Sequence, residues 1–228
     1  MAISTRRPAR REEPLSREQI VRAAVYLLDD VGEGGLTFRA LAGLLATGPG
    51  AIYWHVSGKG ELLAAAAEAV IGDAVSPGDG DGAGPEEAVR SLALGVFDAI
   101  EAHPWLGTQL AVNPGRSPML RLFETIGRQV RALGVPPRAE FTAASTLLHY
   151  ILGVAGQNAA NGRAVGPGVG RTEFISAAAA TWAGLDPEQY PFLRGVADRL
   201  REHDDREEFL SGLDLVLAGI RARLAPPA

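Results

Sequence analysis

Metal binding is the first chemistry to test in this sequence. Cysteine is absent, which excludes a cysteine-based metal site and a disulfide framework. Residues 79–84 (DGDGAG) resemble the start of a calcium loop, but its fifth ligand position is Ala83 and its twelfth is Arg90 instead of a glutamate. The histidines lie far apart, without the spacing of metal ligands. They are His55, His103, His149 and His203. We therefore predict no metal site.

Catalytic and cofactor motifs are missing as well. Residues 166–170 (GPGVG) lack the glycine spacing of a dinucleotide fingerprint, and no predicted strand precedes them. The nucleophile-elbow pattern of hydrolases does not occur either. The sequence therefore predicts a protein that is not an enzyme and that uses no cofactor.

A run of three helices is predicted at the N-terminal end of the chain. The first begins with a capping-box pattern at residues 16–19 and continues, with apolar residues at helical spacing, to the glycines of 32–35. Thr37 can cap a second, short helix. A break follows, and Pro49 suits the first turn of a third helix that contains residues 51–55.

Two short helices separated by a four-residue break, after a longer helix, describe a helix-turn-helix motif. In such a motif the second short helix enters the major groove of DNA, whose width admits one helix. Ile52 and Val56 supply the packed side of this helix, and Tyr53 and His55 can point outward. The motif therefore predicts DNA binding.

The same stretch resembles the TetR family of one-component transcriptional repressors. The resemblance lies in the pattern Leu36-Thr37-x-Arg39-x-Leu41-Ala42, then Tyr53-Trp54-His55-Val56-x-x-Lys59-x-x-Leu62-Leu63. It is close over residues 16–70, whereas the remainder matches only in helical layout and loosely around residues 105–160. With no alternating strand pattern anywhere, we predict an all-α protein. It has a three-helix helix-turn-helix DNA-binding domain and a larger helical ligand-binding and dimerisation domain.

The resemblance implies which residues contact DNA. It places Thr37, Tyr53 and Lys59 on phosphates, and Arg39 on a base edge or a phosphate. The full predicted set is Thr37, Arg39, Pro49, Gly50, Ala51, Tyr53, Trp54, His55 and Lys59.

Three of these residues have an alternative interpretation. Trp54, expected at the groove surface, could instead pack the three helices together. His55 could be an ordinary, partly exposed histidine, and Arg39 could be a solvated surface charge.

The first turn of the predicted reading helix departs from the family. Family members often place a polar side chain there, whereas Gly48, Pro49, Gly50 and Ala51 offer none. Pro49 or Ala51 could contact a thymine methyl, and a glycine permits close approach of the backbone to the DNA. We therefore expect readout to depend on Arg39, on an N-terminal arm and on DNA shape.

That arm is residues 1–15, which we predict to be disordered and Arg-rich. Its arginines can enter the minor groove, as homeodomain arms do, although a solubilising tail is the alternative. They are Arg6, Arg7, Arg10 and Arg11. Residues 1–60 carry eight Lys and Arg against six Asp and Glu, a net charge of +2. Because the whole chain has a net charge of −5, the remaining residues carry −7. This asymmetry fits a basic reading head on an acidic body.

Residues 16–60 are predicted as the helix-turn-helix domain and residues 61–228 as the effector-binding and dimerisation domain. Glycine-rich loops are expected at 74–85 and 163–171. Helices are expected at 59–73, 86–102, after Pro104, and at 118–133, 137–161, 172–184, 188–202 and 205–224.

Two of these helices, 137–161 and 205–224, have long apolar faces. Each face either packs in the core of its own domain or builds a four-helix interface with a second copy, and both interpretations stay open. We predict a homodimer.

The larger domain is expected to hold a small organic effector. Aromatic residues and a leucine would form apolar walls, and polar residues would supply anchors, with core packing as the alternative. The predicted set is Phe97, Trp105, Gln109, Leu110, Phe123, His149, Gln157, Asn158 and Trp182. His149 and Gln157 are eight residues apart on one predicted helix, so we expect both to face one cavity.

A departure from the family's pattern predicts that the effector binds without a metal. The tetracycline-binding member of the family holds its drug as a magnesium complex through a histidine and a glutamate. When this sequence is laid on that pattern, Leu110 or Ala111 lies near the histidine position and Gln157 at the glutamate position. Apolar groups and a neutral amide are poor ligands for a hard cation.

Together these features predict a transcriptional repressor that releases a palindromic DNA operator when an effector binds the C-terminal domain. The expected partners are double-stranded DNA, the effector and a second copy. No apolar run approaches the ~20 residues of a membrane span, so we expect a cytoplasmic protein and no membrane partner. One alternative is a ligand-blind architectural DNA-binding protein, against which the large acidic body argues. The other is a helical enzyme with a vestigial DNA head, and turnover assays on a ligand library address it.

Overall fold

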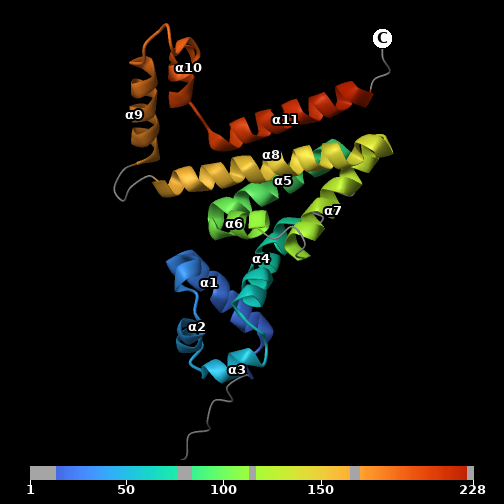
Figure 1. The fold of residues 1–228 in the computed structure, drawn as a ribbon, viewed down its shortest axis with the longest axis vertical. Helices are drawn as coiled ribbons and strands as arrows, with labels where there is room; N and C mark the ends of the chain where they lie inside the picture. Colours follow the sequence, from blue (N-terminus) through green and yellow to red (C-terminus); the bar gives the residue numbers. More distant parts are fainter. Residues whose placement is uncertain (1–13, 76–83, 113–116, 165–169, 225–228) are drawn as a thin grey trace, which may run out of the picture. The chain divides into compact units, whose positions relative to one another are not determined.

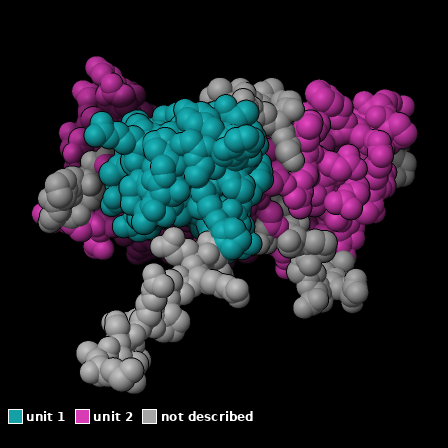
Figure 2. All heavy atoms as spheres, turned by 90° about the horizontal axis from the view of Figure 1, so that it is seen from below, with its two compact units in different colours: residues 1–66 teal, residues 67–228 magenta. Residues whose placement is uncertain are grey.

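The computed structural model describes residues 14–75, 84–112, 117–164 and 170–224, and within these ranges every regular element is an α-helix (Figure 1). The predicted all-α class is therefore confirmed. The chain divides into two compact units, residues 1–66 and residues 67–228 (Figure 2). The four arginines of the arm and most of both predicted glycine-rich loops lie outside the described residues. None of the described helices has the length and apolarity needed to cross a membrane.

The helices follow the predicted order. They are α1 (Arg17–Gly35), α2 (Phe38–Leu44), α3 (Pro49–Tyr53), α4 (Lys59–Val75), α5 (Pro85–Ala102), α6 (Trp105–Val112), α7 (Ser117–Ala132), α8 (Pro137–Ala164), α9 (Arg171–Ala183), α10 (Pro191–Arg201) and α11 (Asp205–Leu224). Three boundaries differ from the prediction. Helix α8 continues to Ala164 instead of ending at residue 161. The third helix ends at Tyr53, so Trp54 and His55 lie in the turn that follows it. The tenth begins at Pro191 instead of residue 188, because the residue before a proline resists the helical conformation.

The start of α1 is the predicted capping box. The Ser16 hydroxyl accepts a hydrogen bond from the Gln19 N–H at 3.1 Å, and the Gln19 side chain accepts one from the Ser16 N–H at 2.9 Å. Near its end α1 kinks at Gly32, whose φ of 68° is readily adopted only by glycine. Helices α1, α2 and α3 share a small core, in which Ile20, Leu41 and Ile52 are fully buried.

The turn between α2 and α3 is a Schellman motif, which closes the C-terminal end of a helix with two backbone hydrogen bonds. The Thr47 N–H donates to the Ala42 carbonyl at 2.9 Å, and the Ala46 N–H donates to the Gly43 carbonyl at 3.3 Å. Ala46 occupies the left-handed position of this motif with a φ of 50°. A Cβ in that conformation costs roughly 1–2 kcal/mol, so the turn that directs α3 is strained.

We therefore expect Ala46→Gly to raise the free energy of unfolding of the helix-turn-helix unit by about 1 kcal/mol. Hydrogen exchange of amides in α1 to α3 measures this locally. The matched variant is Gly134→Ala, because Gly134 (φ 81°) closes α7 with the same motif. It should lower the stability of the second unit by a similar amount. Unchanged or faster exchange of the α1 to α3 amides in Ala46→Gly would contradict the strain argument.

The second unit is organised around α8, which packs against α5, α6, α7 and α11. Figure 1 shows this long helix beside α5 and α11. Its core is apolar throughout the described residues, with Val96 and Ile100 of α5, Ile126 of α7, and Leu147 and Ile151 of α8 completely buried. Helices α9 and α10 pack chiefly on each other and form a hairpin that projects from the rest of this unit (Figure 1).

An aromatic cluster joins α8 to α11. The Tyr150 hydroxyl donates a hydrogen bond to the Phe209 carbonyl at 2.8 Å, and the two rings stack with centroids 5.7 Å apart. Phe209 also contacts Phe97 of α5, with a centroid distance of 4.7 Å. The Tyr150 ring lies directly over Gly212, so closely that a Cβ on residue 212 would overlap the hydroxyl oxygen. Burial raises the pKa of Tyr150, with a smaller contribution from Glu208.

Most of the apolar residues predicted on one face of α8 and of α11 are buried in the core of the second unit. Phe209, Leu213 and Leu217 of α11 are buried, as are Leu148 and Ile151 of α8. Leu215 lies on another face of α11 and is exposed, whereas Phe141 of α8 lies on the same side as Leu148, two turns earlier, and is exposed near the start of the helix. Core packing therefore accounts for most of the predicted apolar residues, and the interface with a second copy stays a prediction.

Candidate DNA-binding surface and effector site

The reading helix α3 is anchored on one side and open on the other. Ile52 and Val56 are buried, as the sequence predicted, while Tyr53 is 55% exposed. Trp54 is 90% exposed, so its alternative role as a core residue is wrong. His55 is half-buried in the turn after the helix. The exposed rings of Tyr53 and Trp54 thus lie next to the buried residues Ile52 and Val56, and they can contact a ligand without rearrangement of the backbone.

Helix α2 presents two of the predicted DNA contacts beside α3. The Thr37 hydroxyl oxygen accepts a hydrogen bond from the Ala40 N–H at 3.1 Å, which caps the helix and leaves the hydroxyl proton able to bind a phosphate. Arg39 is exposed and forms no ion pair with any residue in the described ranges. At the start of α3, Pro49 and Gly50 are exposed and Ala51 is half-buried, so this turn offers only backbone and small apolar groups.

Lys59 begins α4 and is tied to the end of α1. Its ammonium donates a hydrogen bond to the Glu33 carbonyl at 2.6 Å, close to the kink at Gly32. The ammonium has two further protons for a phosphate. This second role of Lys59 could not be predicted from the sequence, because residues 33 and 59 are distant in sequence and a backbone acceptor carries no side-chain signal.

The segment before α4 is held by Glu61. The Ser57 backbone N–H and hydroxyl each donate to one carboxylate oxygen at 2.8 Å, and the Arg17 guanidinium binds the other at 3.2 Å. The Ser57 backbone hydrogen bond, reinforced by the Ser57 hydroxyl and Arg17, lowers the pKa of Glu61 to about 2. Glu61 therefore stays ionised at neutral pH and fixes the turn that leads into Lys59.

The structure places the predicted effector residues in three environments. Phe97, Trp105 and Leu110 are buried in the core, and Phe123, Gln109, Asn158 and Trp182 are half-buried. His149 and Gln157 are exposed on α8, so the single cavity expected for them is wrong for the isolated protomer. Phe97 and Asn158 do line one cavity of about 220 Å³, together with Glu101, Arg163 and Arg171. This cavity thus brings together two members of the predicted set, among the residues that the structure describes.

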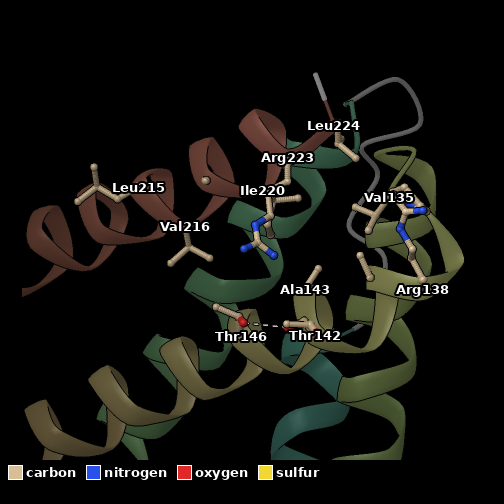
Figure 3. Close-up of a pocket in the computed structure, with 13 residues that line it drawn as sticks. Val135, Arg138, Thr142, Ala143, Thr146, Leu215, Val216, Ile220, Arg223 and Leu224 are labelled. Atoms are coloured by element: carbon tan, nitrogen blue, oxygen red, sulfur yellow. Dashed lines mark hydrogen bonds between the residues drawn. The ribbon is translucent and has the colours of Figure 1, made fainter. Parts of the chain in front are cut away.

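A larger groove of about 630 Å³ runs between the first half of α8 and the second half of α11 (Figure 3). Leu215, Val216 and Ile220 of α11 line it, opposite Thr142 and Thr146 of α8. Two arginines, Arg138 and Arg223, also border the groove. Figure 3 shows the Thr146 hydroxyl directed at the Thr142 carbonyl, to which it donates at 2.8 Å. The Thr146 hydroxyl is thus satisfied within α8, and the groove is mainly an apolar surface.

A helix-turn-helix unit followed by a separate all-helical unit defines the class of one-component DNA-binding regulators. Comparisons with known proteins agree. Residues 77–224 match the family model described as the tetracyclin repressor-like C-terminal domain. The chain therefore belongs to the TetR family, and the DNA-binding transcriptional repressor predicted from the sequence is confirmed at the level of that family.

Two similar proteins come from Streptomyces. The solved transcriptional regulator SCO7222, a TetR from Streptomyces coelicolor, is 58% identical, with a TM-score of 0.84 over 92% of this chain and 99% of that one. The HTH-type transcriptional repressor DrrR1 of Streptomyces coeruleorubidus is 34% identical over 66% of this chain. That match spans 56% of the length of DrrR1.

A second similar solved structure carries a ligand. ActR from Streptomyces coelicolor, in complex with actinorhodin, has a TM-score of 0.75 and covers 94% of this chain and 100% of its own. At 23% identity, this likeness establishes a common fold.

Proposed function

We propose that this protein is a homodimeric repressor that binds a palindromic operator and releases it when a small organic effector binds the second unit. The observation that carries the proposal is the anchored surface of α2 and α3, with exposed Tyr53 and Trp54 above buried Ile52 and Val56. In functional terms we divide the chain into an arm (residues 1–15), a DNA-binding domain (16–60) and an effector-binding and dimerisation domain (61–228).

The proposed DNA contacts form two groups. Thr37, Tyr53 and Lys59 bind phosphates, which fixes the register of α3 in the major groove but carries no sequence information. Arg39, Trp54 and the first turn of α3 meet base edges, with His55 beside them. Because that turn has no polar side chain, Arg39 and the N-terminal arm contribute much of the sequence preference.

The DNA-binding proposal is tested by Lys59→Ala. The variant should weaken binding to all DNA sequences alike and lower the slope of log affinity against log salt by about one unit, because one phosphate contact is lost. The matched control is Arg22→Ala, which removes an exposed cation of α1 that pairs with Glu18 at 2.6 Å. Its slope should stay unchanged. An unchanged slope in Lys59→Ala removes Lys59 from the interface.

The composition of the chain allows a second test of the same contact. Lys59 is the only lysine in the sequence, so an amine-reactive reagent modifies one side chain and the N-terminus. Bound operator DNA should protect Lys59 from modification, as measured by mass spectrometry of the peptide that contains it. A hydrogen-bonding role toward Glu33 alone predicts the same modification rate with and without DNA.

The effector proposal rests on the second unit. ActR, which shares its fold, has been solved in complex with actinorhodin, and this supports an organic ligand for the present unit as well. Phe97 and Asn158 are the best-placed predicted anchors, since both line the 220 Å³ cavity. We propose that Trp105, Gln109, Leu110, Phe123 and Trp182 contribute to the same effector domain, while His149 and Gln157 depend on a partner to cover them.

The effector is expected to bind without a divalent cation. A compound that releases the protein from its selected DNA fragment should give the same dissociation constant in EDTA and in magnesium by isothermal titration. The physical reason is that Leu110 or Ala111, and Gln157, at the positions of the family's metal-site residues, supply no carboxylate or imidazole. Binding that vanishes in EDTA and returns with magnesium would overturn this expectation.

Release of DNA requires that effector binding alters the two DNA-binding heads. We propose that α4 transmits the change, because its residues 59–66 belong to the first unit and the rest of it to the second. In the second unit the Glu68 carboxylate of α4 pairs with Arg121 of α7. A decisive shift between binding and released states takes roughly 5 kcal/mol of differential effector affinity.

The proposed dimer forms through the exposed faces of α8 and α11. Leu215 is 76% exposed, and the apolar groove beside it runs along both helices. A second copy related by a two-fold axis would cover this face with its own α8 and α11. The operator should then be a near-palindrome whose half-sites are one helical turn apart, roughly 34–36 Å.

A further inference from the structure

Phe38 is an aromatic residue of the helix-turn-helix unit to which the sequence pattern gives no role. It is the first residue of α2, between the capping residue Thr37 and the exposed Arg39. It is half-buried and does not belong to the buried core. A half-exposed phenylalanine on the proposed DNA face has no polar atom with which to bind DNA, so its role there needs an explanation.

The Phe38 ring stacks on Tyr53. The two rings are parallel within 3°, and their centroids are 4.3 Å apart. The supports of both rings are fixed independently. Thr37 caps α2 through the Ala40 N–H at 3.1 Å, and fully buried Ile52 anchors α3 next to Tyr53. The stack therefore joins two helices that are each held in place by other residues.

Such a contact restricts the side-chain rotamers of the tyrosine. A tyrosine that is 55% exposed would otherwise sample several side-chain rotamers, and each would carry the hydroxyl to a different place. A flat ring held face to face against a second ring permits one orientation of its plane. Pre-organisation of this kind improves affinity because the rotamer is ordered before the ligand binds.

We propose that Phe38 is a positioning residue for DNA recognition: it holds the Tyr53 side chain in the orientation in which its hydroxyl meets the DNA. The proposal rests on the DNA contact of Tyr53 in the proposed function. Phe38 affects DNA binding through Tyr53, so the two residues act together as one unit.

The test is a double-mutant cycle with Phe38→Leu, Tyr53→Leu and the double variant. The probe is the DNA fragment that the wild-type protein selects from a random pool, with a scrambled duplex of equal length as reference. Phe38→Leu keeps apolar bulk but removes the ring, and should weaken binding to the selected fragment about fivefold to tenfold. In the Tyr53→Leu background the same change should have no further effect, because the residue that Phe38 positions is gone.

Phe38→Tyr is the rescue variant, since it restores a ring for stacking, and it should bind as the wild type does. A spectroscopic signature accompanies the affinities. The chain has four tyrosines, and the NMR ring signals of Tyr53, assigned by their loss in Tyr53→Leu, should be displaced by the neighbouring ring. In Phe38→Leu they should move to the position of an unstacked tyrosine, while the other three sets stay in place.

Each of the other outcomes contradicts one part of the proposal. Unchanged affinity in Phe38→Leu, or losses that add fully in the double variant, overturn the positioning role while leaving the Tyr53 contact intact. No loss in Tyr53→Leu instead removes the Tyr53 contact from the proposed function. Hydrogen exchange of α2 and α3 amides is measured on the same samples, and a general loss of protection in Phe38→Leu would assign the residue to packing.

Discussion

Leu215→Arg is expected to convert the protein into a monomer and to weaken operator binding by a factor of about 10² to 10⁴. Leu215 is 76% exposed on α11, at the edge of the apolar groove shared with α8. In a two-fold interface the substitution occurs twice, so two guanidinium groups would be buried in an interface that already holds Arg138 and Arg223. Loss of the second DNA-binding head removes its effective concentration, which is of millimolar order for linked sites.

Sedimentation velocity at micromolar concentration measures the change in mass, and titration of a selected DNA fragment measures the affinity. The control is Leu120→Arg, which places the same charge on α7 at another exposed leucine outside the groove. That variant should remain a dimer with wild-type affinity. A Leu215→Arg variant that stays dimeric would place the interface elsewhere. A monomer with undiminished affinity would show that one head suffices.

Gly212→Ala is expected to destabilise the second unit by about 2 kcal/mol, although the same change in a helix interior normally adds up to about 1 kcal/mol of stability. The added Cβ would overlap the Tyr150 hydroxyl oxygen and would stand 2.9 Å from its ring carbon Cζ. The ring would have to move, and its hydrogen bond to the Phe209 carbonyl and its stacking on Phe209 would be lost.

Urea unfolding, followed by the helical circular dichroism signal, measures the loss. The matched control is Gly127→Ala in α7, where nothing lies within 4 Å of the added Cβ, and this variant should gain stability. In a Tyr150→Phe background the cost of Gly212→Ala should shrink, because the closest atom is gone. Equal behaviour of Gly212→Ala and Gly127→Ala would show that α8 and α11 are not closely packed at this point.

The elements of the fold could be predicted because their signals are local. Ser16, Thr37 and Pro49 mark helix starts through capping chemistry, and apolar spacing marks the buried faces. The buried side of the reading helix was predictable for the same reason. Pro191 overrode the expected start of α10, since a proline constrains the residue before it.

The details of the candidate sites could not be predicted as well from the sequence, because they depend on residues that are distant in sequence. Nothing near Phe38 announces a stack with Tyr53, and nothing near Lys59 announces the Glu33 carbonyl. On α8 the spacing of His149 and Gln157 correctly placed them on one side, but spacing cannot say whether that side faces the core or solvent. Only the packing of α5, α7 and α11 around α8 decides this.

The α9–α10 hairpin has a thermodynamic consequence. Its buried apolar residues are two alanines, Ala179 and Ala197, so little apolar area holds it folded. Of its larger apolar groups, Phe174, Tyr190 and Phe192 are exposed, and others, such as Trp182 and Leu193, are only half-buried. We therefore expect local opening of this hairpin to cost less free energy than global unfolding, so that α9 and α10 can melt and refold while the α5–α8–α11 core stays intact.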